Sequence, residues 1–199
     1  MLENKQPRRS NDQYNTVPAL AEALVACLPF MPGDRALEPS AGGGAFLRAM
    51  QARLGAERVW ANDVDRSVAA RALATPGRWR TGDFASLRAP TGHFQWVVGN
   101  PPYSEAEAHA RHALSLAPCV AFLMRLQWLG SNGRNITGCP QCKYEQALWE
   151  QYPPRRVSVI TPRPSFTGGG TDRAQEYGFI WWDQGYSGPT IMDRIIWRT

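Results

Sequence analysis

Short apolar runs and longer amphipathic stretches alternate along the chain, separated by segments rich in glycine, proline and aspartate. Apolar residues at helical spacing predict helices over 18–29, 45–54, 65–75 and 104–117, with Ser104 capping the last. Compact apolar runs predict seven strands, at 35–38, 58–61, near Trp79, and at 94–98, 119–124, 156–161 and 177–182. Strands that alternate with helices predict an α/β fold with a doubly wound, mostly parallel sheet.

Two segments depart from this alternation. Residues 1–12 are polar and basic, which predicts a disordered tail, and residues 13–199 are expected to form a single domain. Residues 130–154 are rich in glycine, asparagine and proline. They predict a loop excursion from the sheet, with a short helix near 144–152.

The composition narrows the class of protein. The chain of 199 residues has a formal net charge of +5, which favours anionic partners and nucleic acid first. No run of about 18 apolar residues occurs, so no membrane span is expected, and the N-terminus lacks the apolar segment of a secretory signal. Four cysteines do not make a disulfide framework in a chain of this length, which favours a reducing cytoplasm.

Glycine-rich or acidic segments follow the predicted strands at 38–44, 62–65, 82–84 and 100–103. Ligands of parallel sheets bind beyond the carboxyl ends of the strands, so these segments are candidates for one site. The glycines of the first segment let the backbone approach a ligand closely. The segment lacks the Gly-Lys-Ser/Thr of a phosphate-binding loop, and Leu47 stands where a dinucleotide fingerprint needs glycine or alanine.

Two aspartates stand at the ends of the next strands. Asp63 lies about 20 residues beyond the glycines, the spacing at which a carboxylate reaches ribose hydroxyls. Asp83 is placed to accept from an exocyclic amine, with Phe84 beside the ring. The alternative interpretation of each aspartate is a helix cap.

Four motifs follow one another: Glu-Pro-Ser-Ala-Gly-x-Gly-x-Phe from residue 38, Asn-Asp-x-Asp from 62, Gly-Asp-Phe from 82 and Asn-Pro-Pro-Tyr from 100. In this order they resemble the class I S-adenosylmethionine-dependent methyltransferases, and more closely the N6-adenine DNA methyltransferases of phages and prophages. The resemblance runs from about Tyr14 to the C-terminus and includes 163–172 and 179–183. That family usually shows Thr-Pro near its N-terminus, whereas Val17 here separates Thr16 from Pro18, which weakens the case for Thr16 as a cofactor contact.

The resemblance implies S-adenosylmethionine as the cofactor. It implies a seven-stranded Rossmann-like methyltransferase sheet with one antiparallel late strand, and no separate target-recognition domain. Glu38 and the backbone of 42–44 would lie near the methionine part of the cofactor, Asp63 near the ribose, and Asp83 with Phe84 near the adenine ring. The cofactor-binding residues expected on this basis are Glu38, Ser40, Gly42, Gly44, Phe46, Asp63, Asp83, Phe84 and Asn100.

The catalytic residues expected on the same basis are Asn100, Pro101, Pro102 and Tyr103. An exocyclic adenine amine is a poor nucleophile because its lone pair is delocalised into the ring. The side-chain oxygen of Asn100 and the carbonyl of Pro101 would accept from its two N–H bonds, and the two prolines restrict the backbone that carries these oxygens. Tyr103 would stack on the target base, a contact worth roughly 1–3 kcal/mol. The alternative is a plain β-turn with an aromatic plug.

Similar enzymes hold the flipped base with a second aromatic residue from a late loop, for which Phe166 is the candidate. The alternative is that Phe166 packs over the sheet edge. Arg163 and Arg173 lie in the same segment and are candidates for phosphate contacts. The expected substrate is double-stranded DNA with the target base flipped out of the stack.

The leading interpretation is therefore a cytoplasmic enzyme of the site-specific DNA adenine-N6 type, in a bacterial or phage-infected host cell. It would act as a monomer or weak dimer, with relaxed sequence specificity or a separate specificity partner. The same motifs would serve RNA adenine or a protein glutamine. A non-catalytic nucleic-acid-binding subunit is disfavoured because Asn100 and Tyr103 are both present.

Other ligand-type residues receive no functional role. His109 and His112 have the spacing of a solvated helix face. Cys139-Pro-Gln-Cys142 has half the spacing of a zinc site, with no second pair nearby, so no metal is expected. Cys27 and Cys119 are expected in the core.

Overall fold

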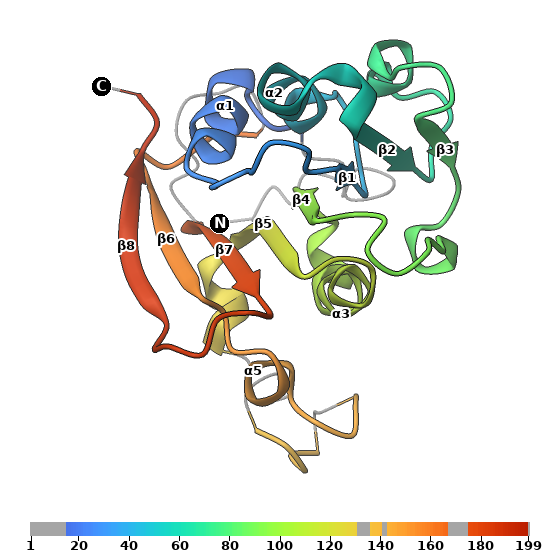
Figure 1. Cartoon of the computed structure of the whole chain (residues 1–199). Helices are drawn as coiled ribbons and strands as arrows, with labels where there is room; N and C mark the ends of the chain where they lie inside the picture. Colours follow the sequence, from blue (N-terminus) through green and yellow to red (C-terminus); the bar gives the residue numbers. More distant parts are fainter. Residues whose placement is uncertain (1–14, 131–135, 141–142, 167–174, 199) are drawn as a thin grey trace, which may run out of the picture.

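The computed structural model describes residues 15–130, 136–140, 143–166 and 175–198. Their strands form one sheet in the order β3-β2-β1-β4-β5-β7-β6-β8, with helices on both faces (Figure 1). The strands are β1 (Ala36–Glu38), β2 (Val59–Asp63), β3 (Trp79–Thr81), β4 (Trp96–Gly99), β5 (Cys119–Arg125), β6 (Arg156–Thr161), β7 (Tyr177–Asp183) and β8 (Ile191–Ile196). β7 pairs antiparallel with β5 and β6, and the other pairs are parallel. The expected α/β fold with an antiparallel late strand is confirmed.

The helices divide between the two faces of the sheet. α1 (Pro18–Ala26) and α2 (Ala45–Leu54) cover one face, and α3 (Ala106–Leu116) and the short α5 (Leu148–Gln151) lie on the other (Figure 1). The first layer buries Leu20, Phe46 and Met50 against the sheet, while the second buries Phe122 and Trp182. Each such side chain contributes about 1.5–3 kcal/mol on burial, so both layers hold the strand ends in place.

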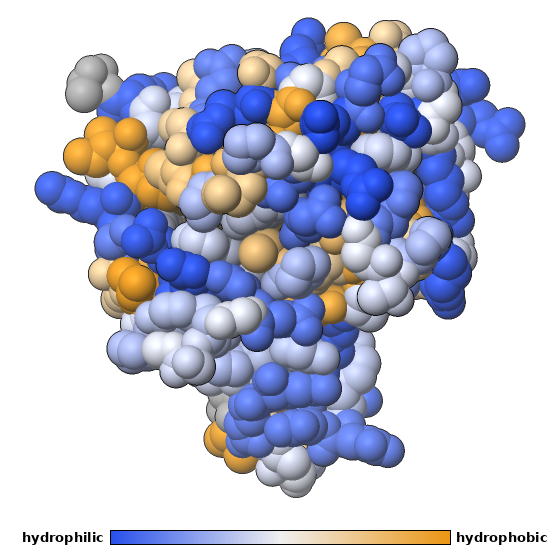
Figure 2. Space-filling view, in the orientation of Figure 1, coloured by the Kyte–Doolittle hydropathy of each residue, from blue (hydrophilic) through white to orange (hydrophobic). Residues whose placement is uncertain are grey.

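The sheet has eight strands among the described residues rather than the seven that the sequence predicted. The additional strand, β8, lies at the edge beside β6. It was missed because Asp193 and Arg194 interrupt its apolar residues. Ile191, Met192 and Ile196 of this strand are exposed, and Figure 2 shows hydrophobic residues gathered along this edge.

Two predicted helices are replaced or shortened by 3₁₀ turns. Residues 65–75 form a 3₁₀ turn at Ala69–Leu73 instead of a helix. The backbone N–H of Ala70 donates to the carbonyl of Gly42 at 3.1 Å, which holds this segment against the glycine loop. Ser104 is not a helix cap, because Tyr103–Glu105 forms a 3₁₀ turn after the two prolines and α3 begins at Ala106.

The excursion after β5 lies below α3 in Figure 1. Its helix, α5, is shorter than the predicted 144–152. Arg111 of α3 binds it by donating to the carbonyl of Gln146 at 2.8 Å and to Oε1 of Gln151 at 3.0 Å. The Arg111 guanidinium also lies 4.0 Å from the ring centre of Tyr144. None of the described helices is long and apolar enough to cross a membrane.

The cysteines differ in part from the expectation. Cys27 was predicted to lie in the core but is exposed, because it is the residue that caps the C-terminus of α1. Cys119 is half-buried at the start of β5, and burial raises the pKa of its thiol to about 12.

Candidate active site

A cavity of about 550 Å³ lies at the carboxyl ends of β1, β2 and β4, and we call it the main cavity. It is lined by Asn15, Pro39, Ser40, Gly42, Asn62, Asp63, Val64, Asp83, Phe84, Asn100, Pro102, Ser104, Glu105 and His109. A small recess of about 30 Å³ adjoins it and shares Asn15, Ser40, Gly42 and Asn100. The recess also contacts Glu38, Phe46 and Thr16. Residues from all four predicted motifs therefore meet in one place.

Asn62 joins the loops that follow three neighbouring strands. Its Nδ2 donates to the carbonyls of Pro39 and Gly82, both at 3.0 Å. Its Oδ1 accepts from Nη1 of Arg80 at 2.7 Å. Because Asn62 is buried, each of these bonds satisfies a polar group that water does not reach. The side chain thus fixes the relative positions of the loops that surround the main cavity.

Asp63 organises the glycine loop as well as lining the main cavity. Its Oδ2 accepts from the backbone N–H of Gly42 at 2.8 Å, and its Oδ1 accepts from that of Asp65 at 2.9 Å. A carboxylate has about four acceptor sites, so two ribose hydroxyls can still bind to it. These two backbone bonds hold the Asp63 carboxylate in place at the wall of the main cavity.

Gly44 is the one predicted cofactor residue that lines neither cavity. It caps α2 with φ +78°, a left-handed conformation that favours glycine. A Cβ at this position would lie 2.6 Å from Cδ1 of Leu73. The structure therefore places Gly44 where the loop packs closely against the 3₁₀ turn.

Glu38 ends β1 with a side chain that is 2% exposed. Its Oε2 has no hydrogen-bond partner among the described residues. Burial raises the pKa of Glu38 well above its usual value of 4.5, the backbone N–H of Leu47 lowers it, and the charge of Asp63 raises it further. A positively charged group in the recess would stabilise the ionised form of this carboxyl.

Asp83 and Phe84 stand at the end of the main cavity nearest β3. Oδ1 of Asp83 caps a 3₁₀ turn by accepting from the backbone N–H of Ala85 at 2.9 Å, which is the alternative interpretation of this residue. Asp83 is itself exposed, and its second oxygen is available to a ligand. The buried ring of Phe84 lies 5.2 Å from the ring of His109 and 4.8 Å from that of His112.

His109 does not belong to a solvated face, contrary to the expectation. It is 7% exposed and lines the main cavity. Its Nε2 lies 3.4 Å from Oγ of Ser40, and its Nδ1 lies 3.2 Å from the carbonyl of Glu105. Burial lowers the pKa of His109, so the ring is neutral at pH 7. His112 is half-buried and contacts the carbonyl of Leu87 at 3.1 Å, so it is not a solvated residue either.

Asn100 follows β4 and lines both the main cavity and the recess. Its Nδ2 donates to Oγ1 of Thr16 at 3.2 Å, which fixes the orientation of the amide group. Thr16 therefore reaches the site although Val17 interrupts the expected Thr-Pro pair. Pro102 also lines the main cavity, whereas Pro101 is buried beside it.

Tyr103 turns away from the main cavity, toward the ends of β5 and β7. The guanidinium of Arg125 lies 4.7 Å from the centre of its ring, and the ring of Tyr177 lies 6.1 Å away. Phe166 is buried against Tyr177, with ring centres 4.9 Å apart. Tyr103 and Phe166, the two aromatic residues predicted to hold a base, thus lie on either side of the Tyr177 ring. All three rings pack with the hydrophobic core.

Of the two arginines predicted to contact phosphates, the structure describes only Arg163. Arg163 forms an ion pair with Glu176. Arg173 lies outside the described residues. Phe46, predicted near the cofactor, borders the recess but is 1% exposed and packs against Phe179 at 6.4 Å.

Sequence reasoning missed Asn15, Asn62, His109 and Arg125. Asn62 stands inside a quoted motif, so its position at a strand end was a usable signal. The others meet the site through contacts between distant segments, for which no local pattern exists. In the described part of the chain, no three or more His, Cys, Asp or Glu side chains cluster as metal ligands do; Cys142 lies outside that part.

No family model matches this chain, and no curated protein sequence matches it. Several solved structures, however, match its fold. The methyltransferase subunit of a type I restriction–modification system from Streptococcus thermophilus matches with a TM-score of 0.65 at 15% identity, over 90% of this chain and 47% of that subunit. A protein assigned as an RNA methyltransferase from Pyrococcus horikoshii matches with a TM-score of 0.63 at 14% identity, over 90% of this chain and 91% of that one.

A third match is a protein from Listeria monocytogenes that is assigned as a class I S-adenosylmethionine-dependent methyltransferase. Its TM-score is 0.64 at 11% identity, over 96% of this chain and 68% of that one. The chain therefore has the fold of class I S-adenosylmethionine-dependent methyltransferases. It spans about half the length of the Streptococcus thermophilus subunit.

Proposed function

We propose that this chain transfers a methyl group from S-adenosylmethionine to the exocyclic N6 amine of adenine in DNA, with the adenine flipped out of the duplex. The observation that supports this most directly is the main cavity, which brings Asp63, Asp83 and Asn100 together from three successive strands. The two aspartates suit a nucleoside, and the asparagine suits an amine.

The residues around the main cavity fit S-adenosylmethionine. Asp63 would accept from the ribose hydroxyls, and Asp83 would accept from the adenine amine beside the ring of Phe84. Glu38 would face the positively charged end, where a cation relieves the cost of its buried carboxylate. When bound, the cofactor supplies an electrophilic methyl group.

The chain's part in the reaction is to prepare the amine. The Asn100 side-chain oxygen and the Pro101 carbonyl would accept from the two N–H groups and localise the nitrogen lone pair. The bond from Asn100 Nδ2 to Thr16 supports this role because it fixes which way the amide points. The contribution is electrostatic positioning, so no general base with a shifted pKa is required.

Tyr103 would stack on the target base. Arg125 and Tyr177 already fix its ring on the side of β5 and β7, so the base would enter beside Asn100 from that side. Phe166 would have to leave its contact with Tyr177 to form a second face. This role of Phe166 rests on the family resemblance alone.

DNA is favoured over other substrates by the motif order and by the net charge of +5. The solved neighbours do not separate the alternatives, since they include a restriction–modification subunit and an RNA methyltransferase. RNA adenine, a protein glutamine and a non-catalytic nucleic-acid-binding role therefore remain as competing outcomes. A single-domain monomer or weak dimer in the cytoplasm, with or without a specificity partner, completes the proposal.

The test is transfer of a tritiated methyl group to unmethylated duplex DNA, to RNA and to a glutamine-containing protein. We expect label in DNA, recovered as N6-methyladenine after digestion to nucleosides. Asn100→Ala should lower the rate by about 100-fold or more, the usual cost of losing one such contact in a transition state. Ser115→Ala is the control, because its hydroxyl bonds only to its own helix.

Label confined to RNA or to protein would contradict the substrate assignment. An Asn100→Ala rate equal to that of the parent would contradict the catalytic role of Asn100. DNA binding without any methyl transfer would support the non-catalytic alternative instead.

A further inference from the structure

A second cavity, of about 250 Å³, lies on the α3 side of the sheet beside β2 and β3. We call it the β3 cavity. It is lined by Leu37, Trp60, Ala61, Gly77, Trp79, Arg80, Leu87, Arg88, Ala89, Pro90, His93 and Phe94. It shares no lining residue with the main cavity.

The β3 cavity exists because the connection from β3 to β4 is short. A doubly wound sheet normally covers each face with a helix between successive strands. Between Thr81 and Trp96 the only regular element is the 3₁₀ turn Phe84–Ser86. The face of the sheet beside α3 is therefore left open over β2 and β3.

Aromatic rings form much of this surface. Trp60 and His93 are half-buried, so each has both a packed and an open part. Trp79 also borders the cavity, but it pairs with Ala61 and packs with the cluster beside α1 and α2, so its ring lies on the other face of the sheet. His93 meets Trp60 edge to face, with ring centres 5.1 Å apart. Such rings offer a stacking surface for any base, because every base has a π-face.

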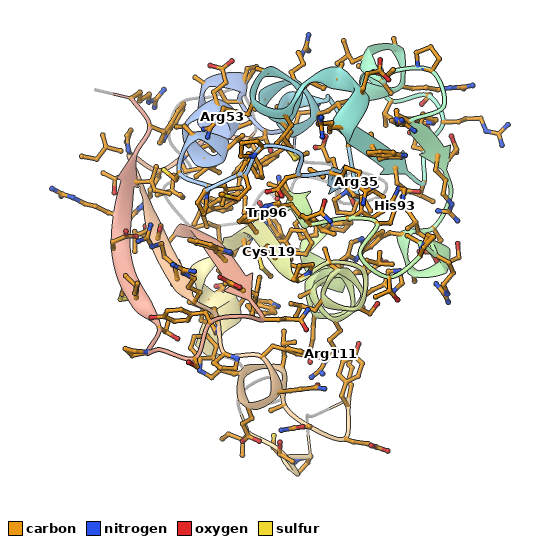
Figure 3. The ribbon with its side chains drawn as sticks, in the orientation of Figure 1. Arg35, Arg53, His93, Trp96, Arg111 and Cys119 are labelled. Atoms are coloured by element: carbon orange, nitrogen blue, oxygen red, sulfur yellow. The ribbon has the colours of Figure 1, made fainter. Side chains whose placement is uncertain are left out.

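Four arginines surround these rings. Arg80 and Arg88 line the β3 cavity, and the guanidinium of Arg78 lies 4.0 Å from the ring centre of Trp60. Arg35 donates to the carbonyl of Gly92, and Figure 3 shows it beside His93. In the described part of the chain, none of the four makes an ion pair with a carboxylate within 4.0 Å.

The positive charge of these arginines acts on His93, which lines the β3 cavity. The pKa of His93 is lowered first by burial and then by the charges of Arg35 and Arg78. The hydrogen bonds of Arg78 and Arg88 go to backbone carbonyls, which leave the guanidinium charge uncompensated. Such a site attracts an anion that also carries a flat ring.

We propose that the β3 cavity binds a nucleic-acid strand, with one base against Trp60 and His93 and with phosphates on Arg35 and Arg88. Single-strand binding surfaces combine these two features, aromatic rings for bases and arginines for the backbone. The contact is independent of the methyl-transfer chemistry, because it uses none of the residues around the main cavity. It would add affinity for the strand without reading its sequence.

The test compares two double variants that remove the same charge from opposite faces of the sheet. Arg35→Gln/Arg88→Gln alters the β3 cavity while keeping hydrogen-bond donors. Arg48→Gln/Arg53→Gln alters α2, and Figure 3 labels Arg53. The guanidinium of Arg53 likewise lies near an aromatic ring, 5.9 Å from the ring centre of Phe30. Arg80 is left intact because it also holds Asn62 beside the main cavity.

Binding of a fluorescent single-stranded oligonucleotide is measured over a range of salt concentrations. The variant of the β3 cavity should lose affinity by about tenfold or more at low salt, and its salt slope should fall by about one for each lost phosphate contact. The α2 variant should keep the slope of the parent. Equal losses in both variants would show a general charge effect and overturn the proposal.

Two further arms test the ligand. The parent protein should bind an abasic oligonucleotide less tightly than the normal one, because the stacked base is missing. Adenosine monophosphate should compete only weakly. Equal binding of the abasic strand, or competition by the mononucleotide as strong as by the strand, would overturn the proposal. Repeating the comparison in Asn100→Ala separates this contact from the proposed function, since the effect should persist there.

Discussion

Glu38 carries a carboxyl group whose burial acts in opposite directions on folding and on binding. Its pKa is raised mainly by burial, so the folded protein holds this proton more tightly than the unfolded chain does. The free energy of unfolding therefore falls as the pH rises above 4.5, and continues to fall until the pH exceeds the raised value. A bound cation would recover part of this loss.

Glu38→Gln should accordingly be more stable than the parent at about pH 7.5 and bind S-adenosylmethionine about tenfold or more weakly. The neutral amide keeps the shape but removes both the buried charge and its attraction for a cation. Urea unfolding measures the first effect and titration calorimetry without DNA the second. The stability difference should shrink toward about pH 4, where the carboxyl of the parent is neutral in both states. A variant that is less stable at pH 7.5, or that binds the cofactor as the parent does, contradicts this role.

At the residue scale the sequence identified acids and amides better than rings. The sequence singled out Asp63, Asp83 and Asn100 because each ends or follows a strand within a short motif, and the structure brings the three to one cavity. The surroundings of Tyr103 could not be found in this way. The contact with Arg125 depends on how β4 and β5 lie side by side, and that packing leaves no local signal.

At the scale of elements, strands were predicted better than helices. The seven predicted strands are all present. In an α/β chain a short apolar run bounded by turn residues is typical of a buried strand, so these runs were a dependable signal. Helix predictions failed where a tertiary hydrogen bond decided the backbone, as at Ala70, or where prolines forced a tighter turn. β8 was missed because an edge strand can carry charged residues, here Asp193 and Arg194, which interrupt the apolar pattern by which strands are predicted.

Gly44 shows what the glycine loop requires from its neighbours. Gly44→Ala should destabilise the protein by roughly 1–2 kcal/mol for the left-handed backbone, and by about 1–3 kcal/mol more for the contact with Leu73. Gly77→Ala is the matched control, since Gly77 has φ +77° and a Cβ there meets no described atom within 4 Å. Urea unfolding of both variants isolates the packing contribution. Equal losses would mean that the loop moves aside without cost.

At the scale of the whole molecule, the two cavities lie against different parts of one sheet. The main cavity uses the carboxyl ends of the strands, as parallel sheets generally do. The β3 cavity exists because no helix connects β3 to β4, and no sequence motif indicates such an absence. The motifs of the sequence therefore predict the main cavity, whereas the β3 cavity depends on the open face beside α3, which is a property of the folded chain.

Folding makes all three histidines of the chain harder to protonate. The pKa values of His93, His109 and His112 are each lowered from 6.5, with burial as the main cause. The unfolded chain thus binds protons more readily, and the free energy of unfolding falls as the pH drops through 6.5 toward the lowered values. Glu38 acts in the opposite sense, because acidification relieves its buried charge. In the parent protein the two effects partly cancel.

The histidine effect should therefore appear most clearly in the Glu38→Gln background. Its free energy of unfolding, from urea titrations, should be lower at about pH 5.5 than at about pH 7.5. Adding His109→Gln should reduce that drop, because His109 is the most buried of the three rings and its protonation costs most. Adding His93→Gln, at the more open β3 cavity, should reduce it less. A free energy of unfolding that stays constant or rises on acidification in Glu38→Gln would show that the folded protein accommodates charged histidines, and that Glu38 is not what masks their cost.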